Sequence, residues 1–354
     1  MIHKKFKINN IVLKNRVIIS PMCQYSADKS GGPSAWHYSH LGSLVKSGAG
    51  MLTIESVAVS KIGRISPKDL CLYDNQQEKK YFKLFKFLKS INNKMPICIQ
   101  ISHSGRKGSS FVPWDKNKGS INIKKGGWKT VSASSLRKDI GWPNPKSLTN
   151  KGIKKVILEF VNTAKRAKKI GFEGLELHIA HGYLLHQFMS PISNKRKDLY
   201  GGSFINRVRI IDEITKKIRL VWPKEKILGA RITGSDHVKN GINVDESIKL
   251  SEILKKNGFD YACVSSGGII KKTGLNTKKR MFRLNIAKKI KSKSKILIST
   301  TGRMSNLKIC KKLIKRKLID MVTIGRPFLK NPFWLYDIKE FKKSTPKQII
   351  RSFE

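Results

Sequence analysis

The strongest constraint on this chain is a repeated alternation of short apolar segments with amphipathic ones. Because the apolar segments are rich in Ile, Val and Leu, we expect buried parallel strands rather than half-exposed ones. Between them, apolar residues recur at helical spacing. The expected strands are 17–21, 51–56, 96–102, 174–178, 227–233, 261–266, 296–300 and 319–324. The expected helices are 37–46, 77–91, 151–170, 204–220, 245–257, 284–291 and 305–316.

About eight strand–helix cycles in one chain predict an α/β fold, a single (β/α)8 TIM barrel spanning 1–354. The main alternative, a doubly wound sheet, needs a glycine-rich nucleotide motif after an early strand, and we find none. Residues 6–16 alternate weakly and are expected to form a hairpin that caps the barrel floor. Residues 103–149 are expected to form a long loop after strand 3. Loops of this length are usually functional, so this one could roof an active site.

Polar residues and glycines concentrate where the expected strands end. In a barrel of this kind, chemistry lies at the C-terminal ends of the strands. The pattern as a whole is more specific than any motif within it. Its members are Ser20-Pro21-Met22-Cys23, Glu55-Ser56, Gln100 with His103, His178 with His181, Arg231, Ser265-Ser266-Gly267, Thr301-Gly302-Arg303 and Gly325-Arg326.

Three of these strand ends suggest specific chemistry. His178, His181 and Tyr183 follow one strand, and two imidazoles with a phenol can bind an oxygen that gains negative charge and then deliver a proton. The helix beyond them is expected to start after Ser203, a good N-cap residue.

Loops after the last two strands of a barrel commonly hold a phosphate. There, glycines allow close approach of the backbone and arginines add positive charge. These are Gly302, Arg303, Gly325 and Arg326.

Several motifs together resemble one known family. They are Asn15-Arg16 with Ser20-Pro21-Met22, Gln100 with Gly105-Arg106, HxxHGYL from His178, YGGSxxNR from Tyr200, and IGRP from Ile324. The chain resembles the old yellow enzyme family of FMN-dependent ene-reductases from about residue 6 to 334. Cys23 followed by Tyr25 is similar to the thermophilic-like branch, which includes the xenobiotic reductases. The chain departs from the family at Ile205, where relatives often carry Glu.

The resemblance implies a flavoenzyme that takes hydride from NADPH or NADH through FMN and reduces an α,β-unsaturated carbonyl compound. It implies that His178 and His181 bind the carbonyl oxygen, with Tyr183 as the proton donor. Tyr25 would line the substrate pocket, and Arg351, in the tail 335–354, would reach a neighbouring subunit of a homodimer or homotetramer. The implied FMN-binding residues are Ser20, Pro21, Met22, Cys23, Ser56, Gln100, Arg231, Gly302, Arg303, Gly325 and Arg326.

The formal net charge of +50 keeps a second interpretation open. Such a charge attracts polyanions, so a flavin-dependent RNA-modifying enzyme of the dihydrouridine synthase type is one alternative, and a non-catalytic basic binding protein is another. The lysines are spread along the whole chain, however, and come with abundant Ile and Asn, which share A/T-rich codons. We therefore attribute the charge to genome composition and expect neither a specific nucleic-acid partner nor membrane binding.

The remaining composition bears on compartment and metals. The five cysteines are scattered, without a CxxC pair, which argues against a disulfide framework or a zinc site. The first residues lack the apolar core of a signal peptide. His37 and His40 lie three apart with no evident third ligand. We therefore expect a cytoplasmic protein without a metal centre.

Overall fold

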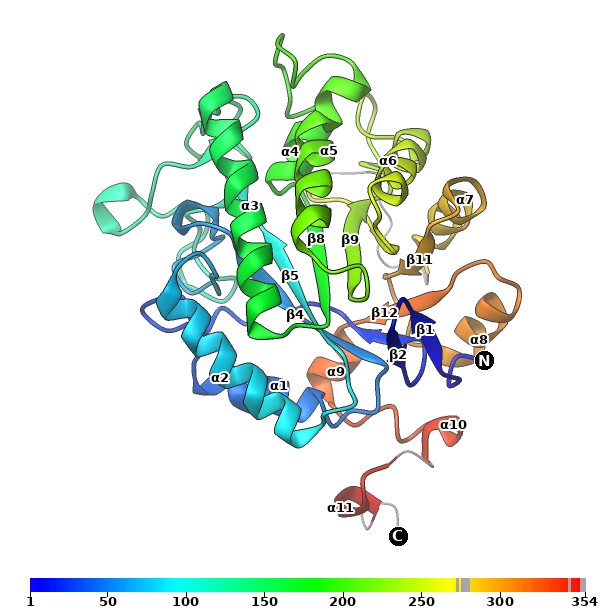
Figure 1. The fold of residues 1–354 in the computed structure, drawn as a ribbon. Coiled ribbons are helices and arrows are strands. Elements are labelled where there is room, and N and C mark those ends of the chain that lie inside the picture. The colour runs from blue at the N-terminus through cyan, green and yellow to red at the C-terminus, as the bar shows by residue number, and fades with distance from the viewer. Residues whose placement is uncertain (272–273, 275–280, 343–344, 351–354) are drawn as a thin grey trace.

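The computed structural model describes residues 1–271, 274, 281–342 and 345–350. Its centre is a closed barrel of eight parallel strands surrounded by helices, which confirms the expected (β/α)8 fold (Figure 1). The strands follow one another around the barrel in chain order. They are β3 (Val17–Ile19), β4 (Met51–Ala58), β5 (Ile97–Ser102), β8 (Gly174–Ile179), β9 (Ile227–Thr233), β10 (Tyr261–Ser265), β11 (Leu297–Thr300) and β12 (Met321–Ile324).

The outer helices lie close to their expected positions. Ser203 accepts a hydrogen bond from the backbone of Asn206 and caps its helix, as expected. The first helix starts at Ala35, two residues before its expected start. None of the described helices is both long and apolar enough to span a membrane. The seven helices are α1 (Ala35–Leu44), α2 (Asn75–Ile91), α3 (Asn150–Ile170), α5 (Phe204–Val221), α6 (Val244–Lys256), α7 (Leu284–Ser294) and α8 (Leu307–Lys315).

Short helices occur after the strands β8 and β12. The sequence did not predict α4 (Leu184–Met189), because a helix of six residues is too short to show a periodic pattern. After the last strand come α9 (Arg326–Lys330), α10 (Lys339–Lys342) and α11 (Lys347–Ile350). In Figure 1, α10 and α11 lie outside the ring of helices.

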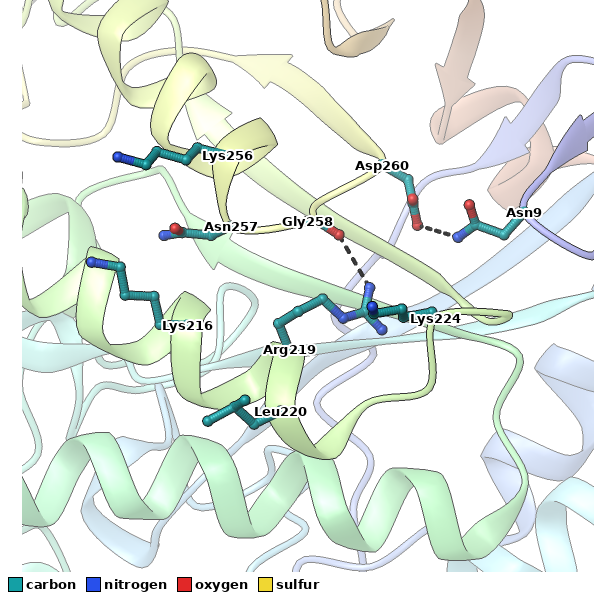
Figure 2. Close-up of a pocket in the computed structure, with 9 residues that line it drawn as sticks. All are labelled: Asn9, Lys216, Arg219, Leu220, Lys224, Lys256, Asn257, Gly258 and Asp260. Carbon is teal, nitrogen blue, oxygen red and sulfur yellow. Dashed lines mark hydrogen bonds between the residues drawn. The ribbon is translucent and has the colours of Figure 1, made fainter.

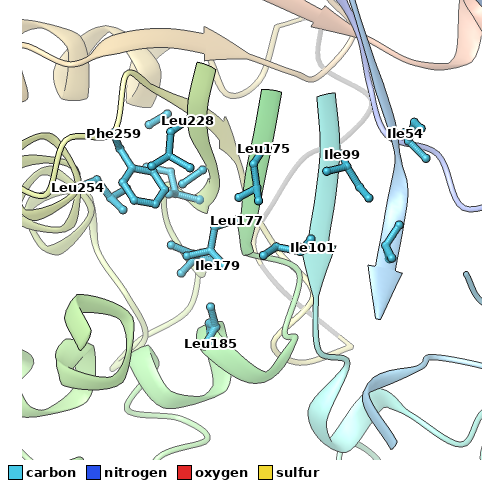
Figure 3. Close-up of a cluster of buried hydrophobic side chains, with 14 of the residues drawn as sticks. Ile54, Ile99, Ile101, Leu175, Leu177, Ile179, Leu185, Leu228, Leu254 and Phe259 are labelled. Atoms are coloured by element: carbon cyan, nitrogen blue, oxygen red, sulfur yellow. The ribbon is translucent and has the colours of Figure 1, made fainter. Parts of the chain in front are cut away.

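The hydrophobic core has two parts. The larger part fills the space between the strands and the outer helices, where Leu228, Leu254 and Phe259 are among the buried side chains (Figure 3). The smaller part closes the floor of the barrel. There the antiparallel hairpin of β1 (Phe6–Ile8) and β2 (Ile11–Leu13) packs against the first residues of the strands, which confirms the expected cap.

One row of side chains inside the barrel links the floor to the upper end. Glu176 is paired in register with Gln100 on one side and with Gly229 on the other, and Gly229 is paired with Tyr261. A Cβ at position 229 would lie 2.1 Å from the Tyr261 ring, so the glycine makes room for that ring. The Tyr261 hydroxyl donates to Glu176 (2.8 Å), and the Gln100 amide donates to the same carboxylate (2.7 Å). The row is therefore fixed by both packing and hydrogen bonds.

The long segment between β5 and α3 is more ordered than a plain loop. It lies where the long loop was expected and contains a two-stranded parallel sheet of β6 (Val131–Ser132) and β7 (Lys146–Ser147), which was not predicted. Strands of two residues are too short to alternate visibly in sequence. The buried Arg106 ties the segment to the barrel, because its guanidinium donates to the carbonyls of Leu136 (3.1 Å) and Ile269 (2.8 Å).

Candidate functional site

Two histidines face each other at the C-terminal end of β8. The Nε2 atom of His178 and the Nδ1 atom of His181 lie 3.0 Å apart. His181 has a backbone φ of 57°, a conformation uncommon outside glycine, so its position needs support. Lys107 provides it, because its Nζ atom donates to the carbonyls of His181 (2.7 Å) and Gly268 (3.3 Å). The histidine pair is therefore held by contacts from two other strand ends.

Tyr183 completes the group that the sequence predicted. Its ring centroid lies 4.6 Å from that of His178, and the Lys107 ammonium lies 5.4 Å from the centroid of the Tyr183 ring. His186 stabilises the turn between the two histidines and α4, because its Nδ1 atom accepts a hydrogen bond from the Gly182 amide (2.8 Å). The second nitrogen of His186 pairs with the buried Asp236 (2.8 Å), so both ring nitrogens of His186 are used to hold the structure.

Burial sets the protonation of this group. It lowers the pKa of His178 and of His181 well below the ordinary value, and the Arg231 guanidinium lowers both further. Burial also raises the pKa of Tyr183 well above its ordinary value. At neutral pH the two imidazoles are therefore uncharged and the phenol keeps its proton. Such a site offers N–H donors and one O–H acid.

The Arg231 guanidinium lies inside the barrel mouth, where His178 is its register neighbour. One of its terminal nitrogens donates to Ser20 (3.0 Å), and its Nε has no hydrogen-bond partner among the described residues. A buried cation with an unused donor is suited to an anionic or electron-rich ligand. Gln100 and Ser56 are also buried here, and the Ser56 hydroxyl bonds that of Ser102.

A cleft of about 1210 Å³ opens beside Arg231, over the ends of β3, β11 and β12. It brings together the residues predicted to bind a phosphate. Arg283, which was not predicted from the sequence, also lines the cleft. It donates to the hydroxyls of Ser266 (2.8 Å) and Thr301 (3.2 Å). No local motif marks that residue. The lining residues from the prediction are Ser20, Pro21, Met22, Arg231, Gly302, Arg303, Gly325 and Arg326.

Cys23 and Tyr25 lie in the segment after β3. Burial raises the pKa of the Cys23 thiol well above its ordinary value and the Glu55 carboxylate adds to this shift, so Cys23 stays protonated. Tyr25 packs edge-on against Trp114, with ring centroids 5.6 Å apart. Trp114 belongs to the long segment after β5, so that segment contributes a wall beside Tyr25.

A second hollow of about 560 Å³ lies at the opposite end of the barrel (Figure 2). Its carboxylate, Asp260, already accepts from Asn9 (2.9 Å), and Arg219 already donates to the carbonyl of Gly258 (3.1 Å). Its lysines are exposed. Since its acid is paired and the histidines lie at the other end, we place the candidate site in the first cleft.

Comparison with known proteins identifies the family. Residues 2–344 match the sequence model of the NADH:flavin oxidoreductase / NADH oxidase family. The chain belongs to this family. It is 36% identical to the NADH:flavin oxidoreductase FG08077 of Gibberella zeae, over 92% of this chain and 82% of that one. It is 34% identical to an NADPH dehydrogenase of Clostridium acetobutylicum, over 99% of both chains.

Solved structures agree on the fold. Morphinone reductase in complex with tetrahydroNAD aligns with a TM-score of 0.78 at 20% identity, covering 98% of this chain and 91% of that one. An old yellow enzyme homologue from Zymomonas mobilis aligns with a TM-score of 0.79 at 18% identity, covering 98% and 93%. The family model over residues 2–344 confirms the old yellow enzyme resemblance at the level of the family, while the thermophilic-like branch stays a prediction.

This flavin oxidoreductase uses FMN and NAD(P)H, and the geometry of the cleft fits FMN. Gly302 has a φ of 105°, a backbone conformation that favours glycine. Because glycine has no side chain, a ligand in the cleft can approach the backbone closely at this position. Arg283, Arg303 and Arg326 line the same end and suit a phosphate. Arg231, whose Nε has no hydrogen-bond partner among the residues that the structure describes, lies beside its register neighbour His178.

Proposed function

We propose that this NAD(P)H-dependent flavin oxidoreductase is an ene-reductase that acts on α,β-unsaturated carbonyl compounds or similar activated alkenes. The observation that carries the proposal is the pair of facing imidazole nitrogens, His178 Nε2 and His181 Nδ1, 3.0 Å apart beside Tyr183. One carbonyl oxygen placed between them could contact both. Donors aimed at an oxygen that gains charge favour the transition state over the bound substrate.

In this proposal Gly302, Arg303, Gly325 and Arg326, beside Arg283, would hold the phosphate of FMN. Pro21, Met22, Cys23, Ser56 and Gln100 would line the flavin together with Ser20. Arg231, held by Ser20, would offset negative charge on the cofactor. When bound, FMN would carry hydride from NADPH or NADH to the β-carbon of the acceptor.

The protein's own residues would bind the substrate and move the proton. His178 and His181 are uncharged, so they can hydrogen-bond the carbonyl oxygen without protonating it outright. Tyr183, whose phenol keeps its proton, would donate it to the α-carbon. Tyr25 and Trp114 would form a wall of the substrate pocket.

A visible spectrum tests the function directly. We expect the purified protein to be yellow, to be bleached by NADPH under anaerobic conditions, and to recover its colour when cyclohexenone is added. Bleaching without recovery across a panel of enones, maleimides and nitroalkenes would contradict ene-reduction. Salt-sensitive tRNA binding without enone turnover would favour the RNA-modifying alternative, and a protein that added FMN cannot turn yellow would favour a binding protein.

We also propose that the chain acts as one FMN-binding unit in a cytoplasmic homodimer or homotetramer. All five cysteines are unpaired, which suits a reducing compartment. The tail residue Arg351, predicted to reach the neighbour's substrate, lies outside the described residues. The proposal for it rests on the sequence resemblance alone.

Mixing two variants tests whether Arg351 acts in the neighbouring subunit. One variant carries Arg351→Ala, and the other carries His178→Ala with His181→Ala. If the arginine acts across the interface, a mixed dimer holds one site with all three residues, and activity rises above that of either parent. Activity equal to the average of the parents would show that Arg351 does not act in trans.

A further inference from the structure

The hydrogen bonds around the histidine pair define where each imidazole carries its proton. The Ala180 amide donates to His178 Nδ1 (3.2 Å). A backbone N–H can only donate, so this nitrogen presents a lone pair. Because the His178 ring is uncharged, its one proton is on Nε2. His178 is therefore fixed as a donor toward His181.

The same reasoning continues to the second ring. His178 Nε2 donates to His181 Nδ1 (3.0 Å), so this nitrogen also presents a lone pair. His181 then carries its proton on Nε2, which lies 2.7 Å from the Ser265 hydroxyl oxygen and donates to it. In the resting protein, one directed chain of hydrogen bonds thus runs from a backbone amide to a serine.

This resting arrangement provides one donor for a ligand oxygen and not two. An anionic oxygen between the rings would meet the N–H of His178 but the lone pair of His181. Two donors require His181 to carry its proton on Nδ1. Its Nε2 would then present a lone pair and need a donor in place of an acceptor.

Ser265 can supply either partner. A hydroxyl both donates and accepts, and its hydrogen turns about the Cβ–Oγ bond without movement of a heavy atom. Ser265 is 1% exposed, and its Oγ has no second hydrogen-bond partner within the described part of the chain. Within the described part of the chain, no other group binds the Ser265 hydroxyl, so it is free to change from acceptor to donor toward His181 Nε2.

We propose that Ser265 is a positioning residue that lets His181 move its proton from Nε2 to Nδ1 when an anionic oxygen binds between the two rings. The proposal deepens the proposed function, since in turnover that oxygen would be the carbonyl oxygen of the substrate. When a neutral phenol binds as phenolate, its proton goes to His181 Nδ1 and the proton on Nε2 leaves to water. The imidazole thus stays uncharged, and one proton is released for each phenol bound.

The experiment uses the FMN-loaded protein with 15N-labelled histidine and p-cresol, a phenol with an ordinary pKa of about 10. We expect the nitrogen shifts of His181 to report protonated Nε2 in the free protein and protonated Nδ1 in the complex. We also expect release of one proton per p-cresol in weakly buffered solution. Protonated Nδ1 in the free protein, or binding without a tautomer change, would overturn the proposal, and neither observation depends on a variant.

Two substitutions separate the tautomer role from packing. Ser265→Ala removes a neutral acceptor of His181 in the free protein and, in the complex, the donor at the end of a hydrogen-bond chain that supports an anion. Because hydrogen bonds to charged groups contribute more than neutral ones, p-cresol should bind roughly tenfold more weakly. Ser265→Thr keeps a hydroxyl and should restore both affinity and the tautomer change. Wild-type affinity in Ser265→Ala would contradict the proposal. A tautomer change with p-cresol but no enone turnover would support the role of Ser265 while contradicting ene-reduction.

Discussion

Replacing His178 and His181 together with alanine is expected to lower the rate of flavin reoxidation by an enone at least about 1000-fold, since loss of a single oxyanion donor typically costs 100- to 1000-fold. The two nitrogens lie 3.0 Å apart and are the donors that a carbonyl oxygen would contact in the proposed site. Stopped-flow absorbance of the reduced protein mixed with cyclohexenone measures this step alone. FMN should remain bound, because the cleft end lined by Arg283 and Gly302 is untouched.

The matched control is His40→Ala, a histidine on α1 outside the site. It should reoxidise at the wild-type rate, which separates loss of the oxygen-binding pair from loss of histidine in general. The double variant should also lose the charge-transfer band that phenols produce with the flavin, because the phenolate uses the same two donors. Enone turnover at the wild-type rate in the double variant would disprove the assignment.

The second large effect is expected from Tyr183→Phe. Removal of a general acid typically costs at least about 100-fold, so reoxidation by the enone should slow by roughly that factor while reduction by NADPH is unchanged. Burial raises the pKa of Tyr183 well above its ordinary value, so the phenol stays protonated as the pH rises through 10. The wild-type rate should therefore show no decline from tyrosine ionisation below that pH.

Measuring the two half-reactions separately decides the outcome. Equal slowing of both would indicate that the phenol shapes the pocket without donating a proton. Unchanged rates for both would mean that another acid delivers the proton. In that case Tyr25→Phe, a change of the same size, should show the loss if Tyr25 is the acid, and neither variant should show it if water is.

Much of the fold could be predicted because its signals are local. Strands buried on both faces give continuous apolar runs, and the outer helices repeat at helical spacing, as in α3. Neighbouring strands in the barrel then bring their ends together, so residues as far apart as Ser20 and Arg231 could be placed at one site. Elements of two to six residues, such as β6 and α4, carry too little pattern to be recognised.

The parts of the site that escaped prediction depend on contacts between distant segments. Ser265 was noted at a strand end, but its bond to His181 depends on the unusual backbone turn at that histidine. Lys107 reaches across to the same turn. Glu176 had a readable signal, since a carboxylate within an apolar strand requires partners when buried. Arg283 had none.

The pairing of Gly229 with Tyr261 has a consequence for how this barrel can change over generations. A side chain at 229 would occupy the space of the Tyr261 ring, and loss of that ring would leave both a void and Glu176 without one of its donors. A substitution at either position alone would therefore lower the stability of the folded barrel. Among descendants of this gene, we expect glycine and tyrosine to be kept or replaced together, with the charge at 176 following the same change.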